Sequence, residues 1–377
     1  MERPKNIHAQ RKELIMKKRM LTVMAGMLAA AVLGGCSGST GTETEAAQTA
    51  AKAEETEAVQ AEAETEAAQA EEQGTDSQYP EKGIEIVVCV SPGGTPDVMT
   101  RLAANWLSEY WGVPVTVTNK SGGGAIPGAL EALDADPDGY TVCAITSQNS
   151  SQQHGANTAP PLDVNIPTYL CRVFDVDLAL TVNAESEWQD IKSFNEWALA
   201  NPDEMICANT GAVSTAAFAT AEWYDAIGGD VSQLRMLTTA GGSDSATQLA
   251  AGNCTMNFGD FAGSRSMVDA GKIRYLATSA KERNPYYPDV PTMAENGVEG
   301  LSVSMWIGYM APEGTPQYVV DAWNEAVQAM IEDEGFKEGL ANVTGRTAYM
   351  NSEDFKSLIL QECDTYQTLA EKLGVRQ

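Results

Sequence analysis

Residues 84–117, IEIVVCVSPGGTPDVMTRLAANWLSEYWGVPVTV, contain one complete strand–loop–helix–strand unit. The apolar, β-branched run 84–90 is typical of a buried parallel strand, and Ser-Pro-Gly-Gly at 91–94 ends it. The segment 95–97, Thr-Pro-Asp, then supplies an N-cap residue, a proline at the first helical position and an acid in the first turn. Apolar residues recur at helical spacing after it, and 113–117 is a second predicted strand. This unit predicts an α/β domain with a mostly parallel sheet.

The same alternation of strands and helices continues along the rest of the chain. Most of the predicted strands end at a glycine-rich or polar turn that precedes a helix. Two such units predict two lobes around a cleft, each lobe a mostly parallel sheet flanked by helices. The further predicted strands are 140–145, 205–208, 234–238, 254–258 and 274–278, and the further predicted helices are 126–133, the segment after 209–211 through Trp223, 244–251, 316–331 and 352–372.

The composition excludes several function classes. The 377 residues include 52 acidic and only 24 basic side chains, a formal charge of −28, so the basic surface of a general nucleic-acid binder is absent. There are two histidines, His8 and His154, and seven cysteines without a CxxC pair. Zinc sites, iron–sulfur clusters and a Ser-His-Asp triad are therefore not expected. We expect no cofactor, no metal and no catalytic residue, and hence not an enzyme.

Residues 16–36, MKKRMLTVMAGMLAAAVLGGC, have the order of a secretory signal: basic residues, an apolar run too short to span a bilayer comfortably, and small residues. The final tetrad, Leu-Gly-Gly-Cys, resembles the lipobox of bacterial lipoproteins, in which the cysteine becomes lipidated. We therefore expect a signal peptide over 1–35, with Met16 as an alternative start, and a lipid anchor on Cys36. The alternatives are a short uncleaved anchor or an ordinary signal with a chance cysteine.

Residues 37–78 contain little besides Ser, Gly, Thr, Glu, Ala and Gln, with eleven acidic residues and one lysine. A segment this poor in large apolar side chains cannot bury enough surface to offset its ordering entropy. Together with the cysteine before it, this segment predicts a disordered, Glu/Ala-rich tether over 36–78 that holds a domain off a membrane. The signal region carries +5 and the tether −10, so residues 79–377 hold −23 of the total of −28.

Three glycine-containing loops stand at strand ends just before helices, at 91–97, 209–215 and 240–245. Ligands of open α/β sheets sit beyond the carboxyl ends of strands, where glycine lets backbone N–H groups approach and a helix N-terminus favours an anion. Together these loops favour a cleft for a carboxylate or phosphate. The P-loop pattern is absent, and GGGAIPG at 122–128 lacks a suitable acid downstream for dinucleotide binding.

Several motifs recur in a fixed order along the folded part of the chain. They are the Pro-Gly-Gly loop ending in an acid at 92–97, the asparagine and glycines of 119–128, Pro-Asp-Gly-Tyr-Thr at 137–141, AGKIRYLATSAKERNPYYPDVPTMAENG at 270–297, Trp306, and Ala-Pro-Glu-Gly-Thr-Pro at 311–316. In this order they resemble the extracytoplasmic solute receptors of tripartite tricarboxylate transporters, the Bug-type binding proteins. The resemblance covers essentially all of 79–377 and also accounts for the lipobox and tether.

The resemblance implies a two-lobed Venus-flytrap fold of the type II periplasmic-binding-protein kind. It assigns 79–180 and 302–377 to the first lobe and 181–301 to the second. It also implies capture of a small carboxylate-bearing metabolite in the interlobe cleft and delivery to membrane permease subunits. The protein would then be an extracytoplasmic, membrane-anchored monomer that binds no nucleic acid.

The resemblance also names the residues expected to bind the ligand. In this family the first loop holds a ligand carboxylate largely through backbone amides and bridging waters, and loops of the second lobe complete the site. Ser147 and Asp260 are further candidates. The residues carried over are Gly93, Gly94, Thr95 and Asp97 from the first loop, and Gly211, Ser214, Thr215, Gly241 and Gly242 from the second lobe.

Departures from the family pattern leave the ligand open. No lysine or arginine falls in the predicted loops, and an aromatic residue common before the first loop is replaced by 89–91, Cys-Val-Ser. Asp97 and Asp260 would suit an ammonium group, so an amino acid or another nitrogenous ligand is an alternative. A sensor that signals to a membrane partner is another alternative. An enzyme is disfavoured because no nucleophile has a histidine base near it in sequence.

Six cysteines remain besides the one in the lipobox. Cys89, Cys143 and Cys254 lie in predicted strands and are expected to be buried. An extracytoplasmic compartment permits disulfides, so a pair such as Cys171–Cys207 stays open.

Overall fold

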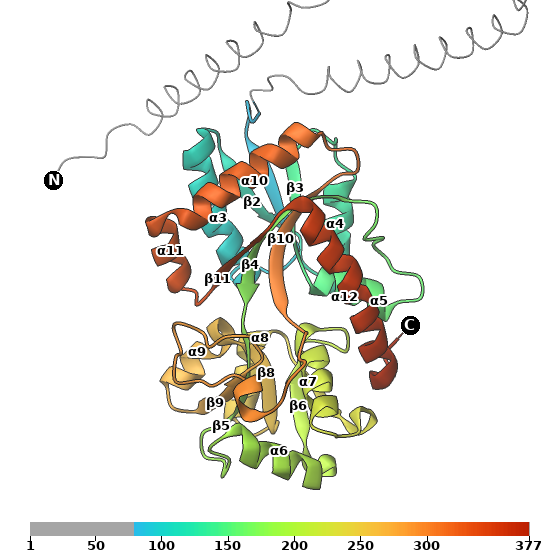
Figure 1. Ribbon diagram of the computed structural model, residues 1–377, viewed down its shortest axis with the longest axis vertical. Coiled ribbons are helices and arrows are strands. Elements are labelled where there is room, and N and C mark those ends of the chain that lie inside the picture. Colours follow the sequence, from blue (N-terminus) through green and yellow to red (C-terminus); the bar gives the residue numbers. More distant parts are fainter. Residues whose placement is uncertain (1–78, 377) are drawn as a thin grey trace, which may run out of the picture. The chain divides into compact units, whose positions relative to one another are not determined.

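The computed structural model describes residues 79–376. The predicted signal region, Cys36 and the tether lie outside the described residues. In the described part the strands form two sheets, and each is the centre of a lobe with its own helices and hydrophobic core (Figure 1). We call the lobe that contains residue 84 the first lobe and the other the second lobe.

The first lobe is built on six strands of the described chain, in the order β11-β4-β10-β3-β1-β2. The strands β1 and β2 of the opening unit pair in parallel, and β1 pairs in parallel with β3 on its other side. The bounds are β1 (Ile84–Val88), β2 (Val115–Asn119), β3 (Thr141–Thr146), β4 (Thr168–Val176), β10 (Met305–Ala311) and β11 (Arg346–Met350).

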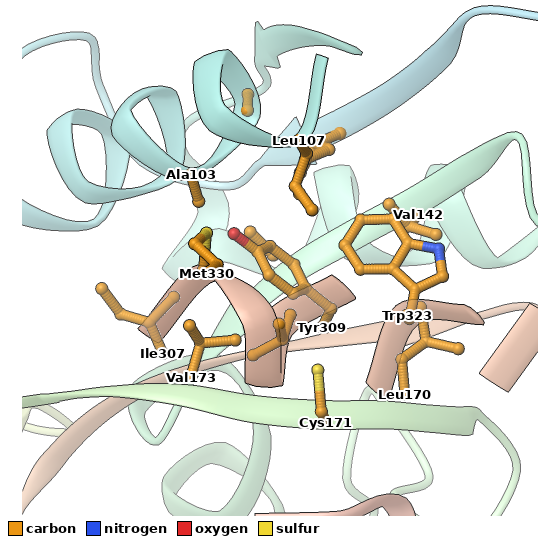
Figure 2. Packing of buried hydrophobic residues seen from close by; sticks show 14 of the residues in the cluster. Ala103, Leu107, Val142, Leu170, Cys171, Val173, Ile307, Tyr309, Trp323 and Met330 are labelled. Carbon is orange, nitrogen blue, oxygen red and sulfur yellow. The ribbon is translucent and has the colours of Figure 1, made fainter. Parts of the chain in front are cut away.

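Helices cover both faces of this sheet. Successive side chains of β1 point to opposite faces, and each face packs against its own helices. Ile86 packs into a core with α3 and α10, whereas Val87 packs into a second cluster with α4 and α12. Figure 2 shows Leu107 and Trp323 around the ring of Tyr309 in the first core. The helices are α3 (Thr95–Trp111), α4 (Ile126–Leu133), α5 (Gln153–Ala156), α10 (Gln317–Glu332), α11 (Glu334–Ala341) and α12 (Ser352–Leu373).

The second lobe is built on five strands, in the order β7-β6-β8-β5-β9 within the residues described. Its helices α6 and α7 contribute to the larger core of this lobe, and α8 packs with a smaller cluster. The bounds are β5 (Leu178–Asn183), β6 (Ile206–Asn209), β7 (Arg235–Thr238), β8 (Met256–Asp260), β9 (Ile273–Thr278), α6 (Ile191–Ala200), α7 (Thr215–Ala226), α8 (Gly242–Ala250) and α9 (Phe261–Asp269). Short helices in the connections are η1 (Gly123–Ala125), η2 (Gln148–Gln152), η3 (Pro202–Glu204), η4 (Val231–Gln233) and η5 (Ala294–Asn296).

Both sheets are mixed, which corrects the expectation of mostly parallel sheets. The strands that join the lobes are the cause. β10 lies antiparallel between β3 and β4, and β5 lies antiparallel between β8 and β9. Each of these two strands follows a crossing and enters its sheet against the direction of the parallel strands, and the edge strand β11 adds a further antiparallel pair with β4.

Three segments connect the two lobes. β4 is separated from β5 by Asp177 alone, and the chain returns through the residues just before Met305 of β10. The helix α12 is the third connection. Its first half places Phe355 in a first-lobe cluster, and its second half places Tyr366 and Leu369 in the core of the second lobe. The lobes are therefore joined by two strand crossings and by one helix that packs on both.

The six cysteines of the described chain are all free and buried, so no disulfide joins Cys171 and Cys207. His154 lies half-buried on α5, where its Nδ1 is 3.4 Å from the carbonyl oxygen of Leu162. Within residues 79–376, no helix has the length and apolar character needed to cross a bilayer. The same residues contain no cluster of side chains suited to a metal ion.

Candidate ligand-binding cleft

A cavity of about 440 Å³ lies between the two lobes. Its first-lobe wall is the loop between β1 and α3 together with the end of β3. Its second-lobe wall is formed by the segments at the starts of α7, α8 and α9. The volume lies within the range of small-molecule sites. We call it the ligand-binding cleft.

Among the described residues, four helices begin at this cleft: α3, α7, α8 and α9. The first turn of a helix has backbone N–H groups without intrahelical partners, and it carries a partial positive charge. Several such ends around one cavity favour an anionic ligand group. This convergence is what the three glycine loops of the sequence predicted, with the start of α9 added to them.

The first loop is shaped by a buried carboxylate. Asp97 is 2% exposed, and its Oδ2 accepts a hydrogen bond from the backbone N of Gly93 (2.8 Å). Its Oδ1 accepts from Asn119 Nδ2 (2.8 Å) and pairs with Arg101 Nε (3.0 Å). Burial alone would raise the pKa of Asp97, but these bonds outweigh it and hold the pKa below its ordinary value. The bond to Gly93, which has a φ of +84°, fixes the loop in a form that favours glycine.

The second-lobe loops leave space for a ligand. Gly241 has an extended backbone, with a φ of 167°, and no heavy atom lies within 4 Å of the position that a Cβ would occupy. Asp260 caps α9 by accepting from the backbone N of Gly263 (2.7 Å). Thr95 Oγ1 donates to Asp260 Oδ1 across the cleft (3.3 Å), so the two lobes touch here directly.

A second side-chain bond between the lobes lies at the edge of the cleft. Gln152 of η2 is fully buried, and its Nε2 donates to Thr215 Oγ1 at the start of α7 (3.0 Å). Thr215 also lines the cavity, so this bond joins the first lobe to a residue of the cleft wall.

The structure brings seven of the eleven predicted site residues to the cleft wall. They are Gly93, Gly94, Thr95, Thr215, Gly241, Gly242 and Asp260. The other four lie behind the wall and support it. Asp97 holds the first loop as described above, and Ser147 Oγ donates to the carbonyl oxygen of Ser304 (3.0 Å). Gly211 donates to Asn209 Oδ1 (2.8 Å), and Ser214 caps α7 through the backbone N of Ala217 (3.3 Å).

Asn257 is a cleft residue that the sequence argument missed. It is the second residue of β8, is 1% exposed and lines the cavity. Its Nδ2 is buried without a hydrogen-bond partner among the described residues. A Cβ at Gly259 would come within 2.6 Å of this nitrogen, so glycine at that position makes room for the amide. The sequence feature that could have indicated it is a polar residue between the apolar residues of Met-Asn-Phe at 256–258.

The charges of the cleft wall are unusual for an anion site. Of the described residues that line it, none is lysine or arginine, and Asp260 is the one with a carboxylate. An anionic ligand group would therefore be held by helix N-termini, hydroxyls and the Asn257 amide. Polar side chains that also line the cleft are Thr146, Gln148, Thr210, Ser243 and Ser245.

Comparison with known proteins settles the family. Residues 99–375 match the sequence profile described as the tripartite tricarboxylate transporter family receptor. The chain belongs to this family. The match covers most of the described residues, including every loop of the second-lobe wall of the cleft.

Individual relatives agree with this assignment. The chain is 27% identical over 299 residues to a Cupriavidus necator protein named "UPF0065 protein in gbd 5'region". The aligned part covers 79% of this chain and 89% of that protein. It is 24% identical over 301 residues to BugT of Bordetella pertussis, over 79% of this chain and 91% of BugT. The structure of the periplasmic binding protein BugD superimposes with a TM-score of 0.68 at 26% identity, over 79% of this chain and 99% of BugD. The fold is the two-lobed, type II periplasmic-binding-protein fold, as the sequence predicted.

Proposed function

We propose that this receptor captures a small carboxylate-bearing metabolite in the cleft and delivers it to the permease of a tripartite tricarboxylate transporter. The observation that supports the ligand class is the convergence of four helix N-termini on the cavity, counted over residues 79–376. Family membership supports the role in transport.

The cleft suggests how a carboxylate would be held. Thr95 lines the cleft at the start of α3 and Gly242 lines it at the start of α8, where first-turn backbone N–H groups lack intrahelical partners. A ligand that takes donors from both walls stabilises the arrangement in which the lobes are close, which is the usual closure of such receptors. The direct bond between Thr95 and Asp260 shows that these two walls come within hydrogen-bond distance.

The location is also part of the proposal. We place the folded lobes outside the cytoplasm, tied to the membrane by a lipid on Cys36 and spaced from it by 37–78. This part rests on the sequence, since these residues lie outside the described structure. It predicts that Cys36→Ala would release the mature protein from membranes into the soluble fraction.

One observation favours a second candidate ligand. Asp260 presents a carboxylate to the cleft where, among the described residues, no lysine or arginine lines the wall. A ligand with both a carboxylate and an ammonium group would match the helix N-termini and Asp260 together. An amino acid is therefore the runner-up to a simple carboxylate.

The test is a ligand screen on the full-length chain, by thermal shift and then by calorimetry. The panel contains malate, adipate and citrate as carboxylates, aspartate and glutamate as acidic amino acids, and alanine as a neutral one. Malate and adipate are included because they are named as ligands in two structures with the same fold, at 20% and 23% identity. A ligand at a hundredfold excess over its dissociation constant stabilises the native state by about 2.7 kcal/mol. A rise with carboxylates alone supports the first candidate, and a rise with amino acids alone supports the second.

A matched pair of variants locates the binding. Gly241→Leu places a side chain in the open space of the cleft and should abolish the shift. Ala251→Leu adds the same side chain at the other end of α8, at an exposed position, and should leave it unchanged. A shift that survives Gly241→Leu would contradict the placement of the ligand, and a flat response after unfolding and refolding would count against both candidates.

A further inference from the structure

Another cavity, of about 570 Å³, lies where the lobes are joined. Its walls are the end of β4, the Asp177 crossing, residues 279–281 and 301–305, β11 and the middle of α12. We call it the hinge cavity. It shares only Leu178 and Met305 with the ligand-binding cleft, so these two side chains form a partition between the two spaces.

The hinge cavity contains two incompletely paired guanidinium groups. Arg172 is only 8% exposed, forms an ion pair with Asp175, and otherwise donates to the sulfur of Met350 (3.8 Å), a weak acceptor. Arg346 pairs through Nη2 with Asp177 Oδ1 (2.9 Å). The Nε of each arginine is buried and has no hydrogen-bond partner among the described residues. Buried donors of a charged group are normally paired, so an acceptor is missing on this side.

Of the three carboxylates that line the hinge cavity in the described part of the chain, Asp177 and Glu362 accept hydrogen bonds from neighbouring side chains. Asp177 also accepts from Asn284 Nδ2 (3.0 Å), in addition to its arginine. Glu362 accepts from Ser151 Oγ (2.7 Å) and from Trp306 Nε1 (3.0 Å). The exposed Lys281 of the second lobe lines the cavity and forms no ion pair within the described residues. Asp175 Oδ1 also has no hydrogen-bond partner among the described residues, so the need for an added acceptor rests on the two buried Nε donors and on Lys281.

The remaining wall of the hinge cavity is mixed, with an apolar part beside serine, threonine and glutamine side chains. Leu301, Val303 and Met305 lie along the returning crossing, and Leu358 lies on α12. A ligand that fills this space would need an apolar body as well as an acceptor. The volume is in the range of small-molecule sites.

We propose that the hinge cavity is a second ligand site, which takes a small amphipathic carboxylate. The carboxylate lies near Arg172, Arg346 and Lys281, and its short hydrocarbon chain packs on the apolar part of the wall. Residues of both lobes line the hinge cavity, so its occupant would contact both. Leu178 and Met305 would separate that occupant from a ligand in the cleft. The proposal concerns a separate site and stands whether or not the cleft ligand is a carboxylate.

The experiment is calorimetric titration of the full-length chain with sodium hexanoate, with 1-hexanol as the uncharged comparison. Hexanoate should bind at one site, and hexanol at least tenfold more weakly, because it offers the same chain without the acceptor charge. Equal binding of hexanol, or no binding of hexanoate, would overturn the proposal.

Variants on one edge strand provide the matched control. Ala348 lines the hinge cavity, whereas its neighbour Thr347 is exposed and does not. Ala348→Trp should fill the space and reduce hexanoate affinity at least tenfold, while Thr347→Trp should leave it unchanged. If Ala348→Trp fails to fold, Lys281→Met, a change at an exposed side chain, should still weaken hexanoate binding several-fold.

The cleft variant separates this result from the proposed function. Hexanoate binding should persist in Gly241→Leu. Binding that is lost in Gly241→Leu but retained in Ala348→Trp would place hexanoate in the cleft and overturn the hinge site, while leaving the proposed function intact. Loss of cleft ligands alone in Gly241→Leu would support both sites.

Discussion

Asn257 brings a buried amide to the wall of the cleft with its Nδ2 donors unpaired. The backbone carbonyl of the same residue accepts from Thr181 Oγ1 (2.9 Å), so the strand is held independently of the amide. An unpaired buried donor costs stability, which an anionic acceptor from the ligand would relieve.

We therefore expect Asn257→Leu, a substitution of similar shape, to weaken ligand binding more than it weakens the fold. Loss of a hydrogen bond to a charged group costs about 1.5–3 kcal/mol, roughly a tenfold to hundredfold change in dissociation constant. Calorimetry gives the affinity, and thermal unfolding without ligand should change little or rise. An unchanged affinity would remove the Asn257 amide from the site.

Asp97 does not line the cleft but stabilises the first loop, which does. Asp97→Asn keeps the shape but loses the charge that pairs with Arg101, and its amide nitrogen would face donors. We expect a loss of about 1–3 kcal/mol of unfolding free energy at neutral pH and weaker binding through a looser first loop.

The effect of Asp97→Asn should depend on pH. Because the folded pKa of Asp97 lies below its ordinary value of 3.8, its stabilisation is present above that value and is lost as pH falls through the lower folded pKa. Denaturant unfolding at pH 5 and pH 3 should therefore show a smaller difference between wild type and variant at pH 3. An equal difference at both pH values would mean that the charge of Asp97 does not stabilise the loop.

At the scale of elements, the local units could be predicted from their own residues, whereas the crossings came only from the family resemblance and the strands on either side of Asp177 were not predicted. The β1–α3 unit and its loop could be predicted because strand pattern, turn residues and helix start lie within a few residues of one another. β4 and β5 went unpredicted because Asp177 alone separates them, so no turn residue divides the run 168–183. The antiparallel pairs of β10 and β5 follow from these crossings, and no local sequence pattern indicates where a crossing occurs.

The candidate site shows the same division. Helix starts can be predicted from the residues around them, and most of the loops before helices did reach the cleft. Which face of a loop points inward is set by tertiary contacts, and for this reason Asp97 and Ser147 lie behind the wall. The Asn257 amide could be assigned to the cleft only once β8 was placed between β6 and β5.

On the scale of the whole molecule, the net charge opposes the proposed ligand. Residues 79–377 hold −23 of the net charge, and a like charge at long range slows the approach of an anion. Salt screens this repulsion, since the Debye length falls from about 30 Å at 0.01 M to about 10 Å at 0.1 M.

We therefore expect the association rate of a dicarboxylate to rise several-fold between 10 and 100 mM salt, with dissociation nearly unchanged. Stopped-flow tryptophan fluorescence would measure both rates, and a neutral amino acid serves as the comparison ligand whose association should not respond. A dicarboxylate rate that falls with salt would show that the cleft attracts anions from a distance despite the net charge.

Helix α12 finally has a mechanical consequence. It is a continuous helix whose first half packs on the first lobe and whose second half packs on the second lobe. A load applied at the C-terminal end therefore meets the second-lobe contacts of Tyr366 and Leu369 first and reaches the first lobe through Phe355. The two strand crossings pass such a load directly between the sheets, whereas α12 passes it through side-chain packing, so the contacts of α12 are the ones expected to yield first.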